Sequence, residues 1–344
     1  MDKKKQMNFN INNFLLAVTD ILDVRDRESN KVSKSHSLRV AYVSLKFAEQ
    51  LNLEPKEMFD LCAYSLFHNY INDDNAKLLG IDNKSNVLSE IINFVHNIDE
   101  SFDLSNEDIS NRDKIIFSVK NDDSNIKYNE IFLNLSSTVD FWMDCQSSNM
   151  ILQYIYSSLY DFTEVLTFEE VLKRTSMFGS LYENVDCFLD KCKLMTSFYN
   201  FEEKDQWTFL IAASMINFGK LSIPITIIEK KESLTKNEYE IVKSNIYNNK
   251  NALRSIYGFD DISKWATRHQ EQLNAEGYPS KIKASDLSLK DRLMAILNIY
   301  NILLSKRIYR SSFTHKEAMD ILTLKAKNYH LDETIIKDIE KVFT

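Results

Sequence analysis

The scarcity of glycine and proline most constrains how this 344-residue chain can fold, because it has only 5 glycines and 3 prolines. Sheet-rich folds need many tight turns, and these two residues supply much of the backbone geometry that such turns require. Apolar residues instead recur at helical spacing, as in Phe14, Leu15, Val18, Ile21 and Leu22. The sequence therefore predicts an all-α fold.

Composition limits the classes of function. A hydrophobic content of 44% with 27% charged residues is typical of a folded globule. The formal charge of 42 − 50 = −8 disfavours binding to polymeric nucleic acid, but it leaves room for a small phosphate ligand in a local basic pocket. The four cysteines form no CxxC pair, and no apolar run approaches the ~18 residues of a membrane span. We expect a cytoplasmic protein with reduced thiols and no membrane insertion.

The chain repeats itself weakly. Residues 36–69, moved forward by 148 positions, align without a gap on residues 184–217, with Asn52 on Asn200 and Glu54 on Glu202. A period of this length predicts two tandem copies of one helical domain and is too long for a solenoid unit. We assign the first copy to 1–130, connecting helices to 131–178 and the second copy to 179–344. The polar segment 97–113 is predicted to be a loop of the first copy.

Two helix starts near the C-terminus are marked by capping boxes. Ser288 is followed three residues later by Asp291, and Thr314 is followed three residues later by Glu317. Each pair precedes an apolar run with helical spacing. The pattern predicts helices that begin just after Ser288 and Thr314.

Four segments carry a family resemblance: IAASMINFGKLSIP at 211–224, LTKNEYEIVKSN at 234–245, RHQEQLNAEGYP at 268–279 and AILNIYNILLSKRIYR at 295–310. In order and spacing, this second copy resembles the HD-GYP family, and the HSLRV stretch at 36–40 resembles the entry helix of an HD domain. The resemblance implies a metal-dependent phosphodiesterase that cleaves the bacterial messenger cyclic di-GMP. In that family, imidazoles and carboxylates hold two or three iron or manganese ions about 3.5–4 Å apart.

The positions that carry metal ligands in the family are mostly occupied by other residue types here. The replaced positions are Ile216, Asn217, Asn245, Gln270 and Asn298. His269 and Glu271 keep the family's residue type, but one imidazole and one carboxylate do not hold a dinuclear centre. We therefore predict that the second copy is catalytically inactive and holds no metal cofactor. A preserved scaffold that lacks the metal ligands favours a signalling protein that binds a partner protein. Cyclic di-GMP is expected as a further ligand. Whether the chain forms a homodimer is left open. The replacing amides are expected to hydrogen-bond one another and fill the site.

Several residues of the family motifs survive. The candidates for binding the phosphates of a cyclic dinucleotide are Lys220, Tyr278, Arg307 and Arg310. The cations among them are equally explained as solvated or salt-bridged surface residues. Gly219 and Gly277 are interpreted as positions that need an unusual backbone dihedral.

The first copy has more histidines at the family's positions. His36, His68 and His96 match the entry helix, the His-Asp pair and the later histidine, although the Asp of the pair is Asn69. Three imidazoles can hold one zinc, iron or manganese ion, and the alternative is a set of hydrogen-bonded core histidines. The nearest candidate for a closing aspartate is Asp122. A metal site here is the basis of the alternative function, a metal-dependent cyclic di-GMP phosphodiesterase or phosphohydrolase that uses these residual histidines.

Overall fold

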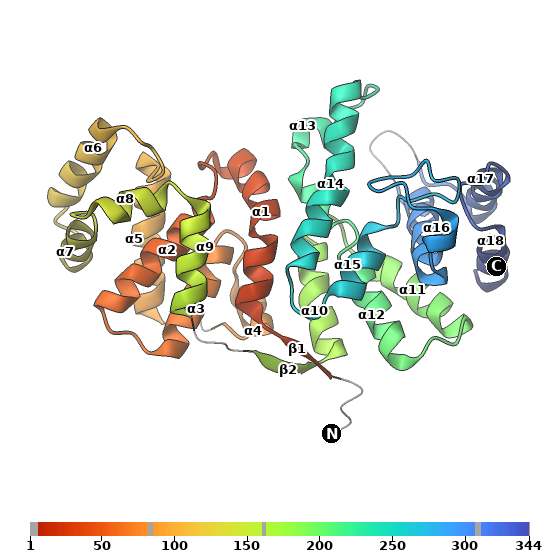
Figure 1. Ribbon diagram of the computed structural model, residues 1–344, viewed down its shortest axis with the longest axis horizontal. Helices are drawn as coiled ribbons and strands as arrows, with labels where there is room; N and C mark the ends of the chain where they lie inside the picture. The colour runs from red at the N-terminus through yellow and green to blue at the C-terminus, as the bar shows by residue number, and fades with distance from the viewer. Residues whose placement is uncertain (1–5, 82–84, 160–162, 307–310, 344) are drawn as a thin grey trace. The chain divides into compact units, whose positions relative to one another are not determined.

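A computed structural model describes residues 6–81, 85–159, 163–306 and 311–343. The described residues are predominantly helical (Figure 1), which confirms the predicted all-α class. Their contacts divide the chain into two compact units: an N-terminal unit (Asn10–Glu164) and a C-terminal unit (Met1–Phe9 with Val165–Thr344). The boundaries predicted at residues 130 and 178 separate the two copies of the repeat from the connecting helices, and they stay a prediction. No helix in the described ranges is long and apolar enough to cross a membrane.

Helix α2 is the centre of the N-terminal unit. It is buried from His36 to Ala48 with few interruptions and packs against α1, α3, α5 and α9. The helices of this unit are α1 (Ile11–Asn30), α2 (His36–Gln50), α3 (Pro55–Phe67), α4 (Asp73–Leu79), α5 (Asn86–Phe102), α6 (Ile109–Lys120), α7 (Ile126–Leu135), α8 (Val139–Cys145) and α9 (Ser148–Ser158).

The C-terminal unit is built around α12, which packs on α10, α11 and α15. Strand β1 (Gln6–Phe9) pairs with β2 (Glu164–Thr167), a short sheet that the sequence pattern did not indicate. The helical elements are α10 (Phe168–Gly179), α11 (Asp186–Phe198), α12 (Glu203–Ser214), η2 (Phe218–Ser222), α13 (Ile225–Ile228), α14 (Lys236–Arg254), α15 (Asp260–Thr267), η3 (Ala284–Asp286), α16 (Leu289–Leu304), α17 (His315–Lys327) and α18 (Glu333–Val342).

The helix–turn–helix pairs predicted to be equivalent have the same turn. Asn52 between α2 and α3 has φ 53°, and Asn200 between α11 and α12 has φ 50°. Asn tolerates this left-handed region better than most residues. The residue after each Asn donates its backbone N–H five residues back, from Leu53 to Ala48 and from Phe201 to Thr196, both at 3.0 Å. This match supports the tandem repeat.

Helix ends follow the sequence signals in two places and depart from them in one. Ser288 caps α16 and Thr314 caps α17, each in a capping box as predicted. The predicted loop at 97–113 is wrong over much of its length, because α5 continues to Phe102 and α6 begins at Ile109. The polar residues of α5 belong to a helix whose other face is buried, and Asp108 caps α6.

The interpretation of Gly219 and Gly277 needs a correction. The glycines with positive φ in the described residues are Gly80 and Gly258, not these two. A Cβ atom at Gly219 would lie 2.3 Å from the backbone oxygen of Asn245, and one at Gly277 would lie 2.4 Å from the backbone nitrogen of Gln272. Both positions are therefore required to be glycine by close backbone packing rather than by their dihedral angles.

Candidate functional site

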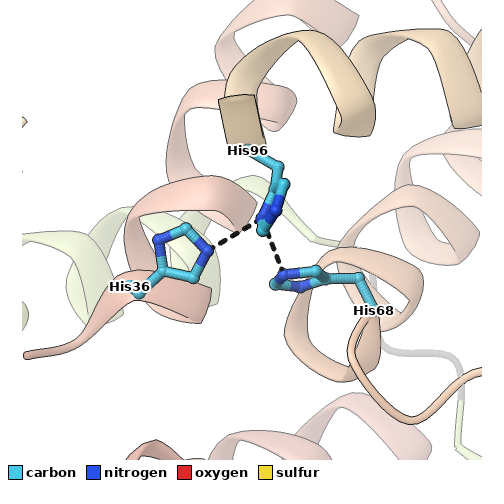
Figure 2. A group of neighbouring side chains, drawn as sticks. All are labelled: His36, His68 and His96. Atoms are coloured by element: carbon cyan, nitrogen blue, oxygen red, sulfur yellow. Dashed lines mark hydrogen bonds between the residues drawn. The ribbon is translucent and has the colours of Figure 1, made fainter. Parts of the chain in front are cut away.

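Three histidines of the N-terminal unit converge, as Figure 2 shows. His36 is the first residue of α2, His68 follows the last residue of α3, and His96 lies on α5. Nδ1 of His96 lies 3.0 Å from Nε2 of His36 and 3.1 Å from Nε2 of His68. One nitrogen atom from each ring falls within 4.8 Å of the others, so the three side chains have the spacing of a metal-ligand set. The packing of α3 and α5 on α2 produces this convergence.

The tautomers of two rings follow from their outer hydrogen bonds. His36 Nδ1 donates to the carboxylate of Asp99 (2.5 Å), and His68 Nδ1 donates to the backbone oxygen of Ser65 (2.7 Å). Both acceptors lack a proton, so Nδ1 is the donor in each ring, and in the tautomer with that single N–H the Nε2 atom of each ring carries a lone pair directed toward His96. A single N–H on His96 satisfies only one of them. The cluster therefore leaves at least one convergent lone pair without a donor, which fits a bound cation.

Electrostatics keep two of these imidazoles neutral. Burial lowers the pKa of His68 to about 3, and burial also lowers the pKa of His96. Neutral imidazole is the form that binds metal. Metal-binding histidines typically donate their second N–H to a carboxylate or a backbone carbonyl, and Asp99 and Ser65 have these roles here.

A buried ion pair supports the cluster. Arg39, 1% exposed, donates from Nε to Asp99 Oδ1 (2.7 Å) and from Nη2 to Asp99 Oδ2 (2.9 Å). Burial alone raises the pKa of Asp99, but the hydrogen bonds from His36 and Arg39 outweigh it and leave the pKa below its usual value. Asp99 is therefore an ionised anchor that holds His36 in place.

Sequence reasoning missed Asp99, Arg39 and Asp26. Asp99 lies three residues after His96 and Arg39 three residues after His36, so each shares a helix face with a histidine. Asp26 is a buried carboxyl group that accepts a hydrogen bond from Tyr70 (2.7 Å), and both Tyr70 and the nearby His36 act to lower its pKa. Burial raises its pKa. Asp122, the candidate for a closing aspartate, instead accepts hydrogen bonds from Ser124.

Glu271, which keeps the family's residue type in the C-terminal unit, binds the backbone of a loop through its side-chain carboxylate. Glu271 is 3% exposed, and its two oxygens accept backbone N–H groups from Ser280 (2.7 Å) and Ile282 (2.9 Å). It fixes the segment after Gly-Tyr-Pro. His269 is 1% exposed and donates from Nδ1 to the backbone oxygen of Ala266 (2.7 Å), which leaves Nε2 without a hydrogen-bond partner.

The expectation that the replacing amides bond one another is wrong for the described residues. Asn217 donates to Glu183 Oε1 (2.7 Å), and Asn245 donates to the backbone oxygen of Val242. The side-chain oxygens of both, and Nδ2 of Asn298, are buried without a partner. Asn217 and Asn245 come from different segments of the chain, and each donates to an acceptor other than a neighbouring amide.

The phosphate-binding candidates lie in different surroundings. Lys220 is half-buried, with Nζ 5.1 Å from the centre of the Tyr182 ring, and its charge contributes to lowering the pKa of His269. Tyr278 is half-buried, and burial raises its pKa to about 12. Arg307 and Arg310 fall outside the described residues. Of the two described candidates, Lys220 is the one whose charge acts on His269, beside the replaced ligand positions.

Buried His269 should make stability depend on pH. Burial lowers its pKa from 6.5 to about 4, so between these values the unfolded chain binds more protons than the folded one. Stability is then lost as the pH falls from 6.5 toward 4, by about 2 kcal/mol between pH 7 and 5 for this group. Urea unfolding at both pH values should show a smaller loss for His269→Gln than for the wild type. Equal losses would contradict this role.

Comparisons with known proteins agree with this fold. Residues 172–335 match the family described as HD domain. The chain is 28% identical over 119 residues to the 3′3′-cGAMP-specific phosphodiesterase 1 of Vibrio cholerae serotype O1, which covers 35% of this chain and 28% of that protein. It is 30% identical over 137 residues to a probable cyclic di-GMP phosphodiesterase of the same organism, covering 38% and 31%. The chain thus spans less than a third of these relatives.

A solved structure is similar over nearly the whole chain. It is a cyclic GMP-AMP specific phosphodiesterase of V. cholerae (V-cGAP3), with a TM-score of 0.59, 12% identity and 98% coverage of both chains. At this identity the likeness concerns the fold alone. Residues 172–335 are thus similar to HD domains, and the proteins with sequence similarity to the chain include phosphodiesterases of cyclic di-GMP and 3′3′-cGAMP.

Proposed function

We propose that this chain is a non-hydrolytic HD-GYP-like signalling protein that acts by binding a partner protein, with a cyclic dinucleotide as the ligand that gates it. The observation that carries the proposal is the loss of ligands in the C-terminal unit. Five ligand positions hold an isoleucine or an amide, and Glu271, the acid that remains, has both oxygens engaged by backbone N–H groups. The relatives are named as phosphodiesterases of 3′3′-cGAMP and cyclic di-GMP, which motivates the choice of dinucleotide.

The chemistry supports a binding role over hydrolysis. A cluster of divalent cations needs anionic ligands to offset its charge and its desolvation. Neutral amides do not supply that charge, and the isoleucine at 216 supplies no donor atom at all. Lys220 keeps a cation near His269 that suits a phosphate oxygen.

Turnover should be absent. The purified chain, given cyclic di-GMP or 3′3′-cGAMP with Mn²⁺ or Fe²⁺, is expected to hydrolyse them at least a thousandfold more slowly than the roughly 1 s⁻¹ at the low end of ordinary enzymes. Chromatography of the products measures this. Metal-dependent hydrolysis that a chelator removes would sink the proposal.

Binding is measured on the same preparation. In calorimetry with cyclic di-GMP, Lys220→Ala should weaken binding by roughly 1–3 kcal/mol, as expected for a lost charged hydrogen bond. Lys236→Ala, an exposed lysine on α14, is the matched control and should leave the affinity unchanged. Equal affinities for the two variants would remove Lys220 from the ligand site.

The histidine cluster favours a second candidate function, a metal-dependent phosphohydrolase of the N-terminal unit. His36, His68 and His96 would hold one zinc, iron or manganese ion, and the unpaired Nε2 lone pair is the observation that fits it. A bound ion would supply Lewis-acid activation of a phosphate ester. In the chain itself, Asp99 and Ser65 orient two of the imidazoles.

Metal binding should stabilise the protein. Zn²⁺ at a hundredfold excess over its dissociation constant contributes about 2.7 kcal/mol, or roughly 5–10 °C in Tm for a unit of this size. His68→Ala should abolish the shift, and His315→Ala, which lies outside the cluster, should retain it. Elemental analysis then gives the stoichiometry. An identical shift in the wild type and His68→Ala would place the ion elsewhere, and binding without turnover would make the ion structural.

A further inference from the structure

A hollow of about 380 Å³ in the C-terminal unit gathers positive charge. Helices α14 and α15, which pack on one another, and the segment after Gly-Tyr-Pro line it. Its cationic side chains are Lys250, Arg254, Lys264 and Arg268. The chain as a whole carries 42 basic and 50 acidic residues, so this concentration runs against the overall charge.

The spacing of the cations is informative. Lys250 and Arg254 are four residues apart on α14, and Lys264 and Arg268 are four residues apart at the end of α15. Each pair lies on one helix face, and like charges at this spacing destabilise a helix. Two such pairs beside one hollow destabilise the folded state through like-charge repulsion, and a bound anion would offset this repulsion.

Acidic residues offset only part of this charge, because the lining has four cationic side chains and two carboxylates, Asp260 and Glu271. Glu271 uses both oxygens on the backbone of Ser280 and Ile282, and Arg268 has a contact of 3.4 Å with Asp291. In the described part of the chain, Lys250, Arg254 and Lys264 have no carboxylate within 4.0 Å. Asp260 is the one lining acid not engaged by backbone.

We propose that this hollow is an anion site for a small phosphate-bearing ligand. Two arginines offer planar forks for phosphate oxygens, and two lysines add point charges. The volume falls within the range of small-molecule sites, which favours a compact ligand over an extended acidic peptide. The lining excludes Lys220, His269 and the replaced-ligand residues, so the proposal is independent of the function proposed above.

The test uses the full chain with three compounds: inorganic phosphate, pyrophosphate and guanosine monophosphate. We expect binding in calorimetry that weakens at least about a hundredfold in the double variant Lys250→Gln, Arg254→Gln, roughly tenfold for each lost charged contact. The double variant Lys231→Gln, Lys236→Gln removes the same charge elsewhere and should bind as the wild type does. Tighter binding of the nucleotide than of pyrophosphate identifies a nucleotide site, and equal binding identifies a phosphate site.

The folded state provides the second readout. Lys250→Gln and Arg254→Gln relieve like-charge repulsion and also remove cations from the C-terminal end of α14, two opposing effects of similar size, so the Tm without ligand should stay close to that of the wild type, which separates lost binding from lost folding. Equal affinities of both double variants would overturn the proposal, as would no binding of the three compounds by the wild type at millimolar concentration. Polyglutamate is tested in addition, and its binding without binding of the three phosphate compounds would also overturn the proposal, in favour of an acidic peptide.

Discussion

Asp99→Asn is expected to destabilise the N-terminal unit by about 3–5 kcal/mol, because it leaves the charge of a buried guanidinium uncompensated. Arg39 is 1% exposed and has its two shortest carboxylate contacts with Asp99, at 2.7 and 2.9 Å. His36 loses its carboxylate acceptor in the same change. Urea unfolding with a probe in this unit measures the difference.

A neighbouring acid supplies the control. Asp103 lies 3.6 Å from Arg39 with its side chain 40% exposed, so Asp103→Asn should cost only about 0–1 kcal/mol. The pH dependence gives a second check. Because the folded-state pKa of Asp99 lies below 3.8, its stabilisation is present above that pH and is lost as the pH falls through the folded-state pKa. A cost below 1 kcal/mol for Asp99→Asn would show that the ion pair is not needed.

Gly219→Ala is expected to destabilise the C-terminal unit by about 3 kcal/mol, at the upper end of the range for overpacking. The new Cβ would lie 2.3 Å from the backbone oxygen of Asn245 and 2.7 Å from Cβ of Asn249. Neither atom retreats easily, since both residues are on the buried face of α14 and Asn249 donates to the backbone of Met215 (2.9 Å). Thermal or urea unfolding measures the loss.

Gly258→Ala separates the two reasons for needing glycine. Gly258 has φ +80°, but its added Cβ would meet only Cε of Met7, at 3.7 Å. Gly258→Ala should lower the free energy of unfolding by about 1–2 kcal/mol, the cost of an alanine in the left-handed backbone region. If Gly219→Ala costs less than Gly258→Ala, the close approach of η2 to α14 is not the constraint.

Local patterns carried the sequence predictions that proved correct. The shortage of glycine and proline gave the all-α class, and the capping boxes at Ser288 and Thr314 marked true helix starts. The error at 97–113 has a physical cause, because polar side chains on one face of a helix look like a loop until the buried face is known. The strand pairing of β1 with β2 joins distant segments and had no local signal.

By itself, the sequence determined which residue types stand at the ligand positions, because chemistry at a position is read directly from the chain. Only the tertiary structure decided what those residues contact. It brought His36, His68 and His96 together, placed Asp99 and Arg39 behind them, and committed Glu271 to a loop. Helical periodicity sets which face a side chain occupies, but the partner across that face depends on packing between segments far apart in the sequence.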